Sequence, residues 1–586
     1  MGDFPALDRD HEARHLRRAM MALALGLLAA LAAKILIWPP EDPERIWITW
    51  YFLRRQDAPM LLLGAQVLFI LPLAPKIGLP RSLTPGAQWR LVLLMAAAIF
   101  AGGVLGGRYL FEGFHLSRDE FLAAFDAQIF SSGRLFATLP GEWRAFADAL
   151  QPQYMAPLKG GEQVVSFYLP LNAIMRALAA ALASPLIMNP LLAAGSLLLL
   201  HGLARDLWPS RPDAALVAVI LLATSSQVLF MSMTSYAMTG HLFFNLLWLR
   251  CFLKGGRWGH GCALAVAFLA CGLHQFVFHP LFAASFIARL WRPGDRRLCV
   301  LYGLAYAGMI LFWGSYLRLA LFWEGVAPPV RDRAVDVGAS YLASQIFLHL
   351  ERFEPLASLP LFLNLLRLIA WQNLLLFPLC ALAWRAIRED RGLASQLAAG
   401  IAITLLAMFV LSPFQGHGWG FRYLHGLLGS LCLLAAYGWI EATPNGTSAK
   451  ASWPISAFAW AGFFSVLIAL PLHAIQARTL IAPGMAAESA IASADVDVVL
   501  IDDDGVLHGH DLVRNDPFLR NRPITLYAWF LEPGQLEALC SRYRMALFGR
   551  EHIARFNLFA SSDPMAERSL KLRETLRTLN CAPVMK

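Results

Sequence analysis

The chain has 586 residues, of which 58% are hydrophobic and 15% are charged, and its mean hydropathy is +0.52. A soluble protein carries roughly a quarter charged residues, so this composition excludes an ordinary soluble globular protein. Much of the formal net charge of +9 falls on short basic turns between apolar blocks. The sequence has no basic stripe with interleaved aromatic residues, which argues against nucleic acid as a partner.

Apolar blocks about as long as a membrane-crossing helix recur along the chain, beginning with Met20–Trp38. Backbone amides find no water in hydrocarbon, so these blocks are expected to be helices. Arg14, Arg17 and Arg18 precede the first block and no small-residue cleavage pattern follows it, which predicts a retained anchor with a cytoplasmic N-terminus. Placing the basic turns inside the cell predicts about thirteen spans. Their approximate ranges are 19–38, 60–76, 89–110, 187–207, 214–231, 240–253, 261–274, 276–291, 298–318, 361–384, 393–412, 423–440 and 453–471.

This topology predicts the fold class: an all-α polytopic membrane protein with a small α/β domain at its C-terminal end. The stretch Val164–Leu182 is expected to be a helix on the outer surface, because a span there would invert every later loop. The polar, chemically rich segments then gather outside, which predicts a function facing the periplasm from a bacterial inner membrane. These segments are Phe111–Glu162, Cys271–Pro280, Ala320–Pro360 and Ser412–His425.

The first outer segment holds a carboxylate pair, Asp119 and Glu120, in the run SRDEFLAAFDAQ. If the run is helical, Asp119 and Asp126 lie on one face, about two turns apart. Arg118 and Arg134 flank the acids and would keep them ionised. An ionised carboxylate can accept a proton from a hydroxyl nucleophile. The simpler interpretation is a surface helix capped by Ser117, with Glu120 completing a capping box.

The tail from His473 onward changes character and predicts a small α/β domain. Strand-like runs cover Val496–Ile501 and Ile524–Phe530, and a helix-like stretch covers Pro533–Tyr543. The run VVLIDDDGVL resembles the first motif of haloacid dehalogenase-type phosphatases, but a polar turn after an edge strand is favoured, since no later acid pair follows. Cys540 and Cys581 are the two cysteines of this tail, and spacing alone leaves their pairing in a disulfide open.

A spanning helix, an outer loop that opens with Asp-Glu, and many further spans together resemble the GT-C superfamily of membrane glycosyltransferases. The similarity is greatest to the branch of protein O-mannosyltransferases and lipid A aminoarabinose transferases. It implies that Asp119 is the general base toward the acceptor and that Glu120 is its neighbour in the motif. It also implies three parts: an added hairpin over 1–88, a catalytic transmembrane domain over 89–472 with an outer loop over 111–186, and a periplasmic domain over 473–586.

Two further segments fall at positions that the resemblance makes functional. In CGLHQF, His274 and Gln275 stand where many members have Thr-Lys, which puts phosphate binding by a lysine in doubt. The run GHGWGFRYLH contains His417 and resembles the Arg-Tyr that opens a late span; Arg422 could hold a phosphate through its planar fork of donors, beside Tyr423. Each histidine could equally be an interfacial polar residue.

No certain cofactor follows from the sequence, and a divalent metal stays possible. Relatives often place a second acid near TSYAMTGHLFF, where this chain has Gly240 and His241, so His241 is a weak metal candidate. Arg331, Asp332 and Arg333 could contact donor or acceptor, or could belong to a solvated loop.

The resemblance implies transfer of a sugar from a polyprenyl-phosphate donor to an extracytoplasmic hydroxyl, with inversion. The expected partners are that lipid-linked sugar, a lipid, glycan or protein acceptor, and membrane lipids. Two alternatives stay open. A transporter or flippase would place charges within the spans and would have broken helices. A polysaccharide ligase or polymerase of another membrane fold would also have a large outer loop.

Overall fold

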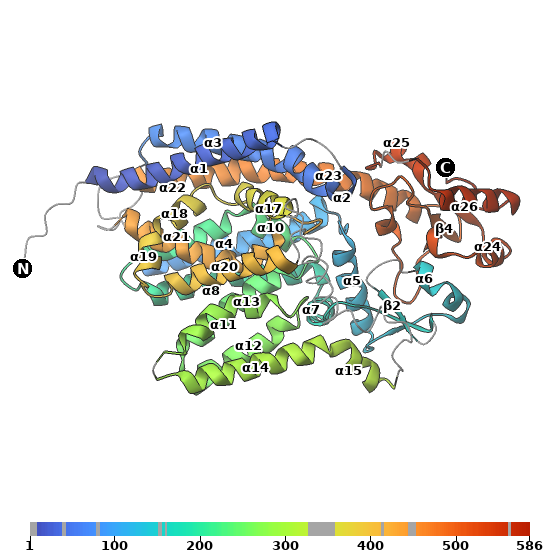
Figure 1. The fold of residues 1–586 in the computed structure, drawn as a ribbon, viewed down its shortest axis with the longest axis horizontal. Coiled ribbons are helices and arrows are strands. Elements are labelled where there is room, and N and C mark those ends of the chain that lie inside the picture. Colours follow the sequence, from blue (N-terminus) through green and yellow to red (C-terminus); the bar gives the residue numbers. More distant parts are fainter. Residues whose placement is uncertain are drawn as a thin grey trace, which may run out of the picture. The chain divides into compact units, whose positions relative to one another are not determined.

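The computed structural model describes ten stretches of the chain, which fall into two compact units. The first unit comprises 1–110, 186–311 and 344–476, and the second comprises 111–185, 312–343 and 477–586. Figure 1 shows the helices and strands in chain order. The described stretches are 9–37, 43–77, 83–150, 155–158, 161–292, 294–325, 358–411, 415–443, 453–560 and 564–585.

The first unit consists of helices. α14 and α23 begin in it and continue into the second unit. Its helices are α1 (Arg9–Ile37), α2 (Pro43–Phe52), α3 (Ala58–Ile70), α4 (Pro85–Leu105), α8 (Met188–Leu207), α9 (Pro212–Ala223), α10 (Ser226–Ser232), α11 (Met238–Lys254), α12 (Gly256–Cys271), α13 (Phe278–Arg289), α14 (Arg296–Gly314), α17 (Ser358–Ala370), α18 (Leu376–Leu382), α19 (Trp384–Arg388), α20 (Ala394–Leu411), α21 (Leu428–Ala442), α22 (Trp453–Phe464) and α23 (Leu470–Ala492).

The protein is a polytopic membrane protein. In the described stretches, eight helices are long and apolar enough to cross a bilayer, or nine if the bent pair α9 and α10 is one span. The thirteen spans expected from the sequence include shorter helices, which this criterion leaves out. The expected spans over 240–291 do form helices, but α11, α12 and α13 have 17, 16 and 12 residues and are too short to count. Gly255 and Gly256, both with positive φ, end α11 and begin α12, which shortens both helices.

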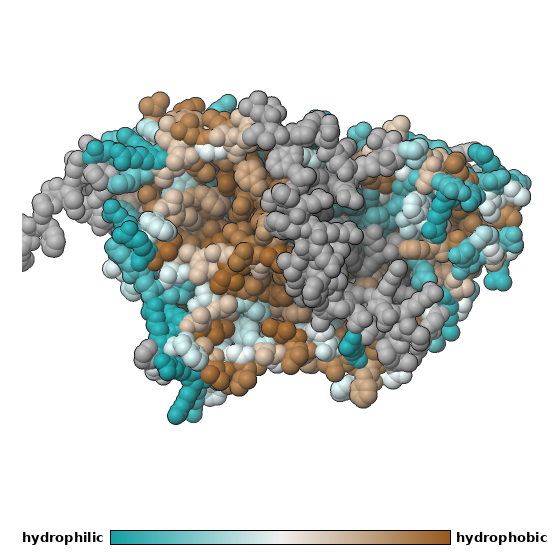
Figure 2. Space-filling view, viewed as in Figure 1, coloured by the Kyte–Doolittle hydropathy of each residue, from teal (hydrophilic) through white to brown (hydrophobic). Residues whose placement is uncertain are grey.

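The outer faces of the long helices are apolar. Figure 2 shows brown, apolar side chains over much of the visible face of the helical part. Large apolar side chains stay exposed there, among them Leu94, Leu304, Leu406 and Leu467. A soluble protein would rarely expose so much apolar surface, whereas lipid tails solvate it.

The second unit contains two three-stranded sheets. In the first, β1 (Ala137–Thr138), β3 (Gln163–Ser166) and β2 (Met155–Leu158) pair antiparallel in that order. In the second, β5 (Ile524–Tyr527), β4 (Val498–Ile501) and β6 (Met545–Phe548) pair parallel. The unit's longer helices are α5 (Arg118–Ser131), α7 (Leu171–Leu182), α15 (Tyr316–Trp323), α24 (Pro533–Cys540) and α26 (Glu567–Thr578).

The segment that follows α4 and the C-terminal tail share one hydrophobic core. Phe125 and Ile129 of α5 belong to the same buried cluster as Val498 and Leu500 of β4. Trp143 stacks on Tyr543 with ring centroids 5.1 Å apart. The sequence analysis assigned these two segments to different domains, because nothing in either segment's own pattern indicates its partner.

Several elements differ from those expected. The stretch Val164–Leu182 is not one helix, since its first residues form β3 and the helix begins at Leu171. The helix that enters the tail runs to Ala492, well past His473. β4 is the central strand of its sheet and not an edge strand, and all four of its residues are buried. The pairing of Cys540 with Cys581, which the sequence left open, is a disulfide with Cα atoms 5.8 Å apart.

Candidate active site

The predicted helix of the outer loop is α5, and its first turn carries Asp119 and Glu120. Ser117 is the N-cap residue, as expected, but its side chain does not cap the helix. Instead, the Leu116 backbone N–H donates to Glu120 Oε2 at 2.9 Å. Glu120 therefore binds the backbone one residue before the N-cap, so the expected capping box with Ser117 does not form.

Two pairs of side chains join α5 to the end of β3. The Tyr168 phenol donates a short hydrogen bond to Asp119 Oδ1. Seven residues along the helix, Asp126 accepts a hydrogen bond from the Ser166 backbone N–H at 3.3 Å and a short one from the Ser166 hydroxyl. The Tyr168 backbone N–H in turn donates to Ser166 Oγ at 3.2 Å. Asp119 and Asp126 lie on one face of α5, and both bind the strand end.

The three acids of α5 differ in exposure. Glu120 and Asp126 are each 2% exposed, whereas Asp119 is partly exposed. Burial raises the pKa of Asp126 to about 7, although its hydrogen bonds from Ser166 lower it again in part. Glu120 interacts with the charge of the buried Arg176 on α7. Asp119 is thus the α5 acid that a substrate can reach.

The two arginines expected beside these acids lie elsewhere. Arg118 is 4% exposed and donates to the carbonyls of Val513, at 2.7 Å, and His510 in the tail. Its Nε lies 3.5 Å from Asp511 Oδ1. Arg134 follows α5, is exposed, and lies over the ring of Phe518. Arg118 therefore anchors α5 on the tail of the same unit, a role that the sequence did not indicate.

In the first unit, Arg422 opens the short helix η8 (Arg422–Leu427), which leads into α21. It is 8% exposed, and its guanidinium lies against the rings of Tyr236 and Tyr423, with a hydrogen bond to the Gln415 carbonyl. Gln415 Oε1 also accepts the Arg422 backbone N–H at 2.9 Å. A guanidinium held in one orientation loses little entropy when it binds an anion.

The glycine-rich loop before Arg422 is held by a buried ion pair that the sequence analysis missed. Arg367 of α17 donates to the carbonyls of Gly418 at 2.7 Å and Gly420 at 3.1 Å. Its Nη1 lies 3.0 Å from both oxygens of Asp57, at the end of the π-helix η1 (Leu53–Asp57). An acid and an arginine inside apolar segments are the signal that could have revealed this pair.

A second buried polar network lies between α11, α13 and α14. His279 Nδ1 is 2.7 Å from Asn245 Oδ1, so Nδ1–H donates and the Tyr306 hydroxyl donates to Nε2 at 2.9 Å. This arrangement fixes the neutral tautomer of His279. His241 is buried on α11 with its ring against Phe278. The network was not expected from the sequence, where His279 had no assigned role.

The remaining candidates occupy loops of the first unit. His274 and Gln275 are partly buried in the turn between α12 and α13. His417 is partly buried in the glycine-rich loop. In the parts of the chain that the structure describes, a metal-capable group of three donors occurs at His508, His510 and Asp511, and His241 is not a member of it. Arg331, Asp332 and Arg333 lie outside the described residues.

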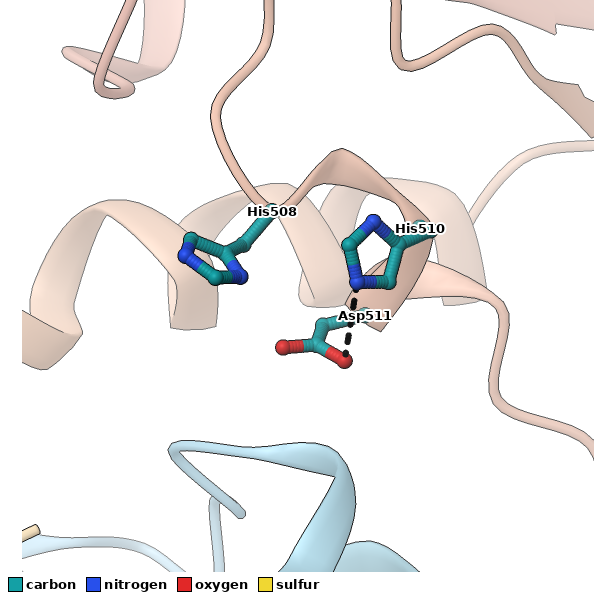
Figure 3. Close-up of side chains that lie close together, drawn as sticks. All are labelled: His508, His510 and Asp511. Atoms are coloured by element: carbon teal, nitrogen blue, oxygen red, sulfur yellow. Dashed lines mark ion pairs between the residues drawn. The ribbon is translucent and has the colours of Figure 1, made fainter. Parts of the chain in front are cut away.

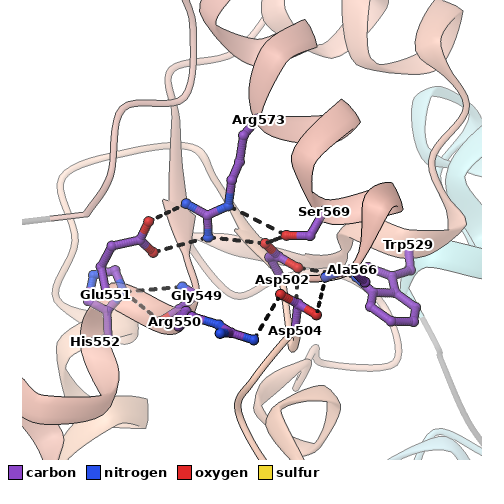
Figure 4. Close-up of polar contacts among 10 residues, drawn as sticks. All are labelled: Asp502, Asp504, Trp529, Gly549, Arg550, Glu551, His552, Ala566, Ser569 and Arg573. Carbon is purple, nitrogen blue, oxygen red and sulfur yellow. Dashed lines mark hydrogen bonds and ion pairs between the residues drawn. The ribbon is translucent and has the colours of Figure 1, made fainter. Parts of the chain in front are cut away.

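The phosphatase-like motif after β4 is fully engaged in ion pairs and hydrogen bonds (Figure 4). Asp502 is completely buried, lies 3.2 Å from the Arg573 guanidinium and accepts from the Trp529 indole at 3.2 Å. Asp504 pairs with Arg550 at 3.3 Å and accepts the Ala566 backbone N–H. Carboxylates committed in this way hold the sheet to α26 and its neighbours, which agrees with the structural interpretation of the motif.

No protein-family model matches the chain, and no curated protein matches it. Among solved structures, it is similar to the crystal structure of ArnT from Cupriavidus metallidurans bound to undecaprenyl phosphate. The identity is 12%, the match covers 75% of this chain and 86% of that chain, and the TM-score is 0.46. At this identity residue roles do not transfer.

Proposed function

We propose that this protein is a membrane glycosyltransferase that moves a sugar from a polyprenyl-phosphate donor to an extracytoplasmic hydroxyl. The observation that carries the proposal is Asp119. It is the one partly exposed acid of the three on α5, held by the Tyr168 phenol at the start of the helix. It lies in the first turn of α5, where the positive end of the helix dipole attracts an anion. An ionised, positioned carboxylate is the group that a hydroxyl nucleophile needs as a base.

The reaction follows from these groups. Asp119 takes the proton of the acceptor hydroxyl while that oxygen attacks the anomeric carbon from the face opposite the phosphate. The bond from the anomeric carbon to the phosphate oxygen breaks, the lipid phosphate leaves with the bonding electrons, and the configuration inverts. In the first unit, Arg422 is by itself a candidate for binding a phosphate, because its guanidinium is held in place and charge-assisted bonds stabilise the negative charge of a phosphate.

The membrane setting supports a lipid-linked donor. Eight apolar helices of spanning length provide a hydrocarbon environment for a polyprenyl tail. The disulfide between Cys540 and Cys581 supports an oxidising compartment, and hence a periplasmic location, for the second unit. The cytoplasmic N-terminus is proposed from the arginines before the first apolar block. The resemblance adds Glu120 as a motif neighbour and His274, Gln275, His417 and Tyr423 as candidates for substrate contact.

A transporter or flippase of a lipid-linked substrate is the second candidate. Two observations favour it. The pair α9 and α10 forms a span bent by 56° at a short break, and Asp57 with Arg367 places a charge pair inside apolar segments. Broken helices and buried charges mark transport pathways in membrane proteins. The glycosyltransferase is preferred because neither feature explains an acid presented at the start of an outer helix.

One experiment separates the two. Membranes containing wild type or Asp119→Asn are given a panel of radiolabelled polyprenyl-phosphate sugars, and label is measured in the acceptor fraction. We expect wild type to transfer one donor sugar and the variant to lose about 10²–10⁴-fold in rate while keeping donor binding. The matched control is Asp148→Asn, since Asp148 is exposed in the same outer segment. If Asp119→Asn transfers sugar as fast as wild type, Asp119 is not the catalytic base. If wild type moves the lipid-linked substrate across the membrane without transferring sugar, the transporter is supported.

A further inference from the structure

Three potential metal ligands converge just after the central strand β4. They are His508, His510 and Asp511, and one donor atom from each lies within 4.8 Å of the others. His510 and Asp511 belong to the short helix η11 (Gly509–Leu512). Figure 3 shows the two imidazoles and the carboxylate facing one shared space. We propose that these three side chains bind a divalent transition metal of the zinc class.

Neighbouring groups fix the orientation of His510. Its Nδ1 lies 3.2 Å from Asp503 Oδ2, and its Nε2 faces Asp511 Oδ1 at 3.9 Å. The Tyr527 hydroxyl donates to the other oxygen of Asp503 at 3.0 Å. Nδ1–H therefore donates to the carboxylate, which leaves the Nε2 lone pair directed at the shared space. A metal-binding histidine almost always donates its second N–H to such an oriented acceptor.

The backbone brings the two histidines to the same side. His508 has a φ of 56°, a left-handed conformation that is unfavourable for a residue with a Cβ. At Gly509 a Cβ would lie 2.7 Å from the Cβ of Asp503, so no larger residue fits without a shift. The tight turn His508-Gly509-His510 is thus specified by its sequence. Strained backbone of this kind concentrates at binding sites.

The donor set selects the class of metal. Two imidazoles and one carboxylate suit Zn²⁺ and its neighbours, whereas Ca²⁺ and Mg²⁺ prefer oxygen ligands. In a tetrahedral site with metal–donor distances of about 2.0–2.1 Å, the donor atoms lie roughly 3.3 Å apart. The three donor atoms therefore need to move only slightly closer together to bind one ion. A fourth position stays open for water. Asp503 and Asp511 are the carboxylates beside the histidines, while Arg118 lies 3.5 Å from Asp511 and Arg514 donates to the Asp511 carbonyl at 2.8 Å.

The site is linked to α5 within the same unit. Arg118 donates to the carbonyl of His510 and lies 3.5 Å from Asp511, and it immediately precedes Asp119. Bound metal should therefore stabilise the first turn of α5. Any consequence for sugar transfer rests on the proposed function, whereas metal binding itself does not.

Metal binding is tested on the tag-free full-length protein in detergent, stripped with a chelator and dialysed. Zn²⁺ is titrated and counted by elemental analysis, and Co²⁺ is titrated by its visible spectrum. We expect one ion per chain, a tetrahedral Co²⁺ spectrum without a thiolate band, and a higher unfolding temperature on Zn²⁺ addition. His510→Ala should lose the ion, and Asp503→Asn should bind it about 10–100-fold more weakly. Asp495→Asn, an exposed acid of the same unit, should bind as wild type does.

Three results overturn the proposal. They are no Zn²⁺ or Co²⁺ bound by the wild type, unchanged binding by His510→Ala, and binding of Ca²⁺ or Mg²⁺ in preference to both. If His510→Ala does not fold, Asp503→Asn decides, since it keeps the side-chain volume and all three ligands. A protein that binds Zn²⁺ but transfers no sugar would support this site and contradict the proposed function, so the two failures are distinguishable.

Discussion

Two acid-rich segments of the second unit look alike in sequence and do different things in the structure. At the start of α5, Asp119 meets the phenol of Tyr168 and stays partly exposed. After β4, Asp502 is completely buried against Arg573, Ser569 and Trp529. The first carboxylate is oriented by a neutral donor, whereas the second is neutralised by a cation. The partner, and not the acid itself, decides whether a carboxylate is available for chemistry.

The sharpest way to break this comparison is to remove the buried acid. Asp502→Ala should destabilise the second unit by about 3 kcal/mol, because it leaves the Arg573 charge poorly paired in a buried site. This loss of stability lies at the lower end of the range for a broken buried ion pair, because Arg573 keeps its contact with Glu551. The measurement is thermal unfolding of the purified full-length chain, followed by the fluorescence of its tryptophans.

The control for that prediction is Asp495→Ala. Asp495 also pairs with an arginine, Arg544, but its side chain is 94% exposed. Water and salt screen such a pair, so its removal should leave the unfolding midpoint where it is. Transfer per folded molecule should be unaffected in both variants. If Asp502→Ala is as stable as wild type, the carboxylate of Asp502 does not stabilise the fold.

The second prediction sharpens the other side of the comparison. Tyr168→Phe removes the hydroxyl that donates to Asp119 and should slow transfer by about 10–100-fold, since a hydrogen bond to a charged group contributes roughly 1.5–3 kcal/mol. The acidic limb of the pH–rate profile should move to higher pH, because a carboxylate that loses a donor is protonated more readily. Stability should change little, because Tyr168 is partly exposed.

The readouts for Tyr168→Phe are kcat/KM against pH and the unfolding temperature. Asp119→Asn is the reference variant, since its transfer rate should be low and should not follow the acidic limb of the pH–rate profile. A slower variant whose pH profile coincides with that of wild type would assign Tyr168 to packing and not to orientation of the base.

The sequence predicted the membrane part and the helix of the first outer loop well, because both depend on local patterns. Block hydropathy located the long spans, and the seven-residue spacing correctly placed Asp119 and Asp126 on one face. The expected spans outnumber the described helices of spanning length, since glycine-bounded helices such as α12 are apolar yet short. Long-range partners could not be predicted at all. Arg118 binds carbonyls almost four hundred residues away, and no single-chain pattern encodes that contact.

The same limit explains Asp126. Its position on the helix suggested substrate binding, but the structure buries it and Ser166, some forty residues later, takes up its oxygens. Local periodicity gives the face of a helix on which a side chain lies and not what covers that face. The role of Asp126 is therefore best decided by its titration, which differs between a buried positioning group and an exposed one.

The smallest predicted effect concerns this acid. Burial raises the pKa of Asp126 to about 7 in the folded chain, well above its unfolded value near 4. Between these values the folded protein binds the proton that the unfolded chain has lost, so stability falls as pH rises from about 4 to 7 and then levels off.

Asp126→Asn keeps a neutral acceptor for Ser166 and removes this slope. We compare the unfolding temperatures of the variant and of wild type at each pH. Their difference, variant minus wild type, should increase by about 2–4 °C or more between pH 5 and pH 8, which corresponds to about 1 kcal/mol. Taking the difference cancels the other titrating groups. A difference that does not change with pH would mean that Asp126 is ionised and solvated throughout, which would return it to the group of acids that a substrate can reach.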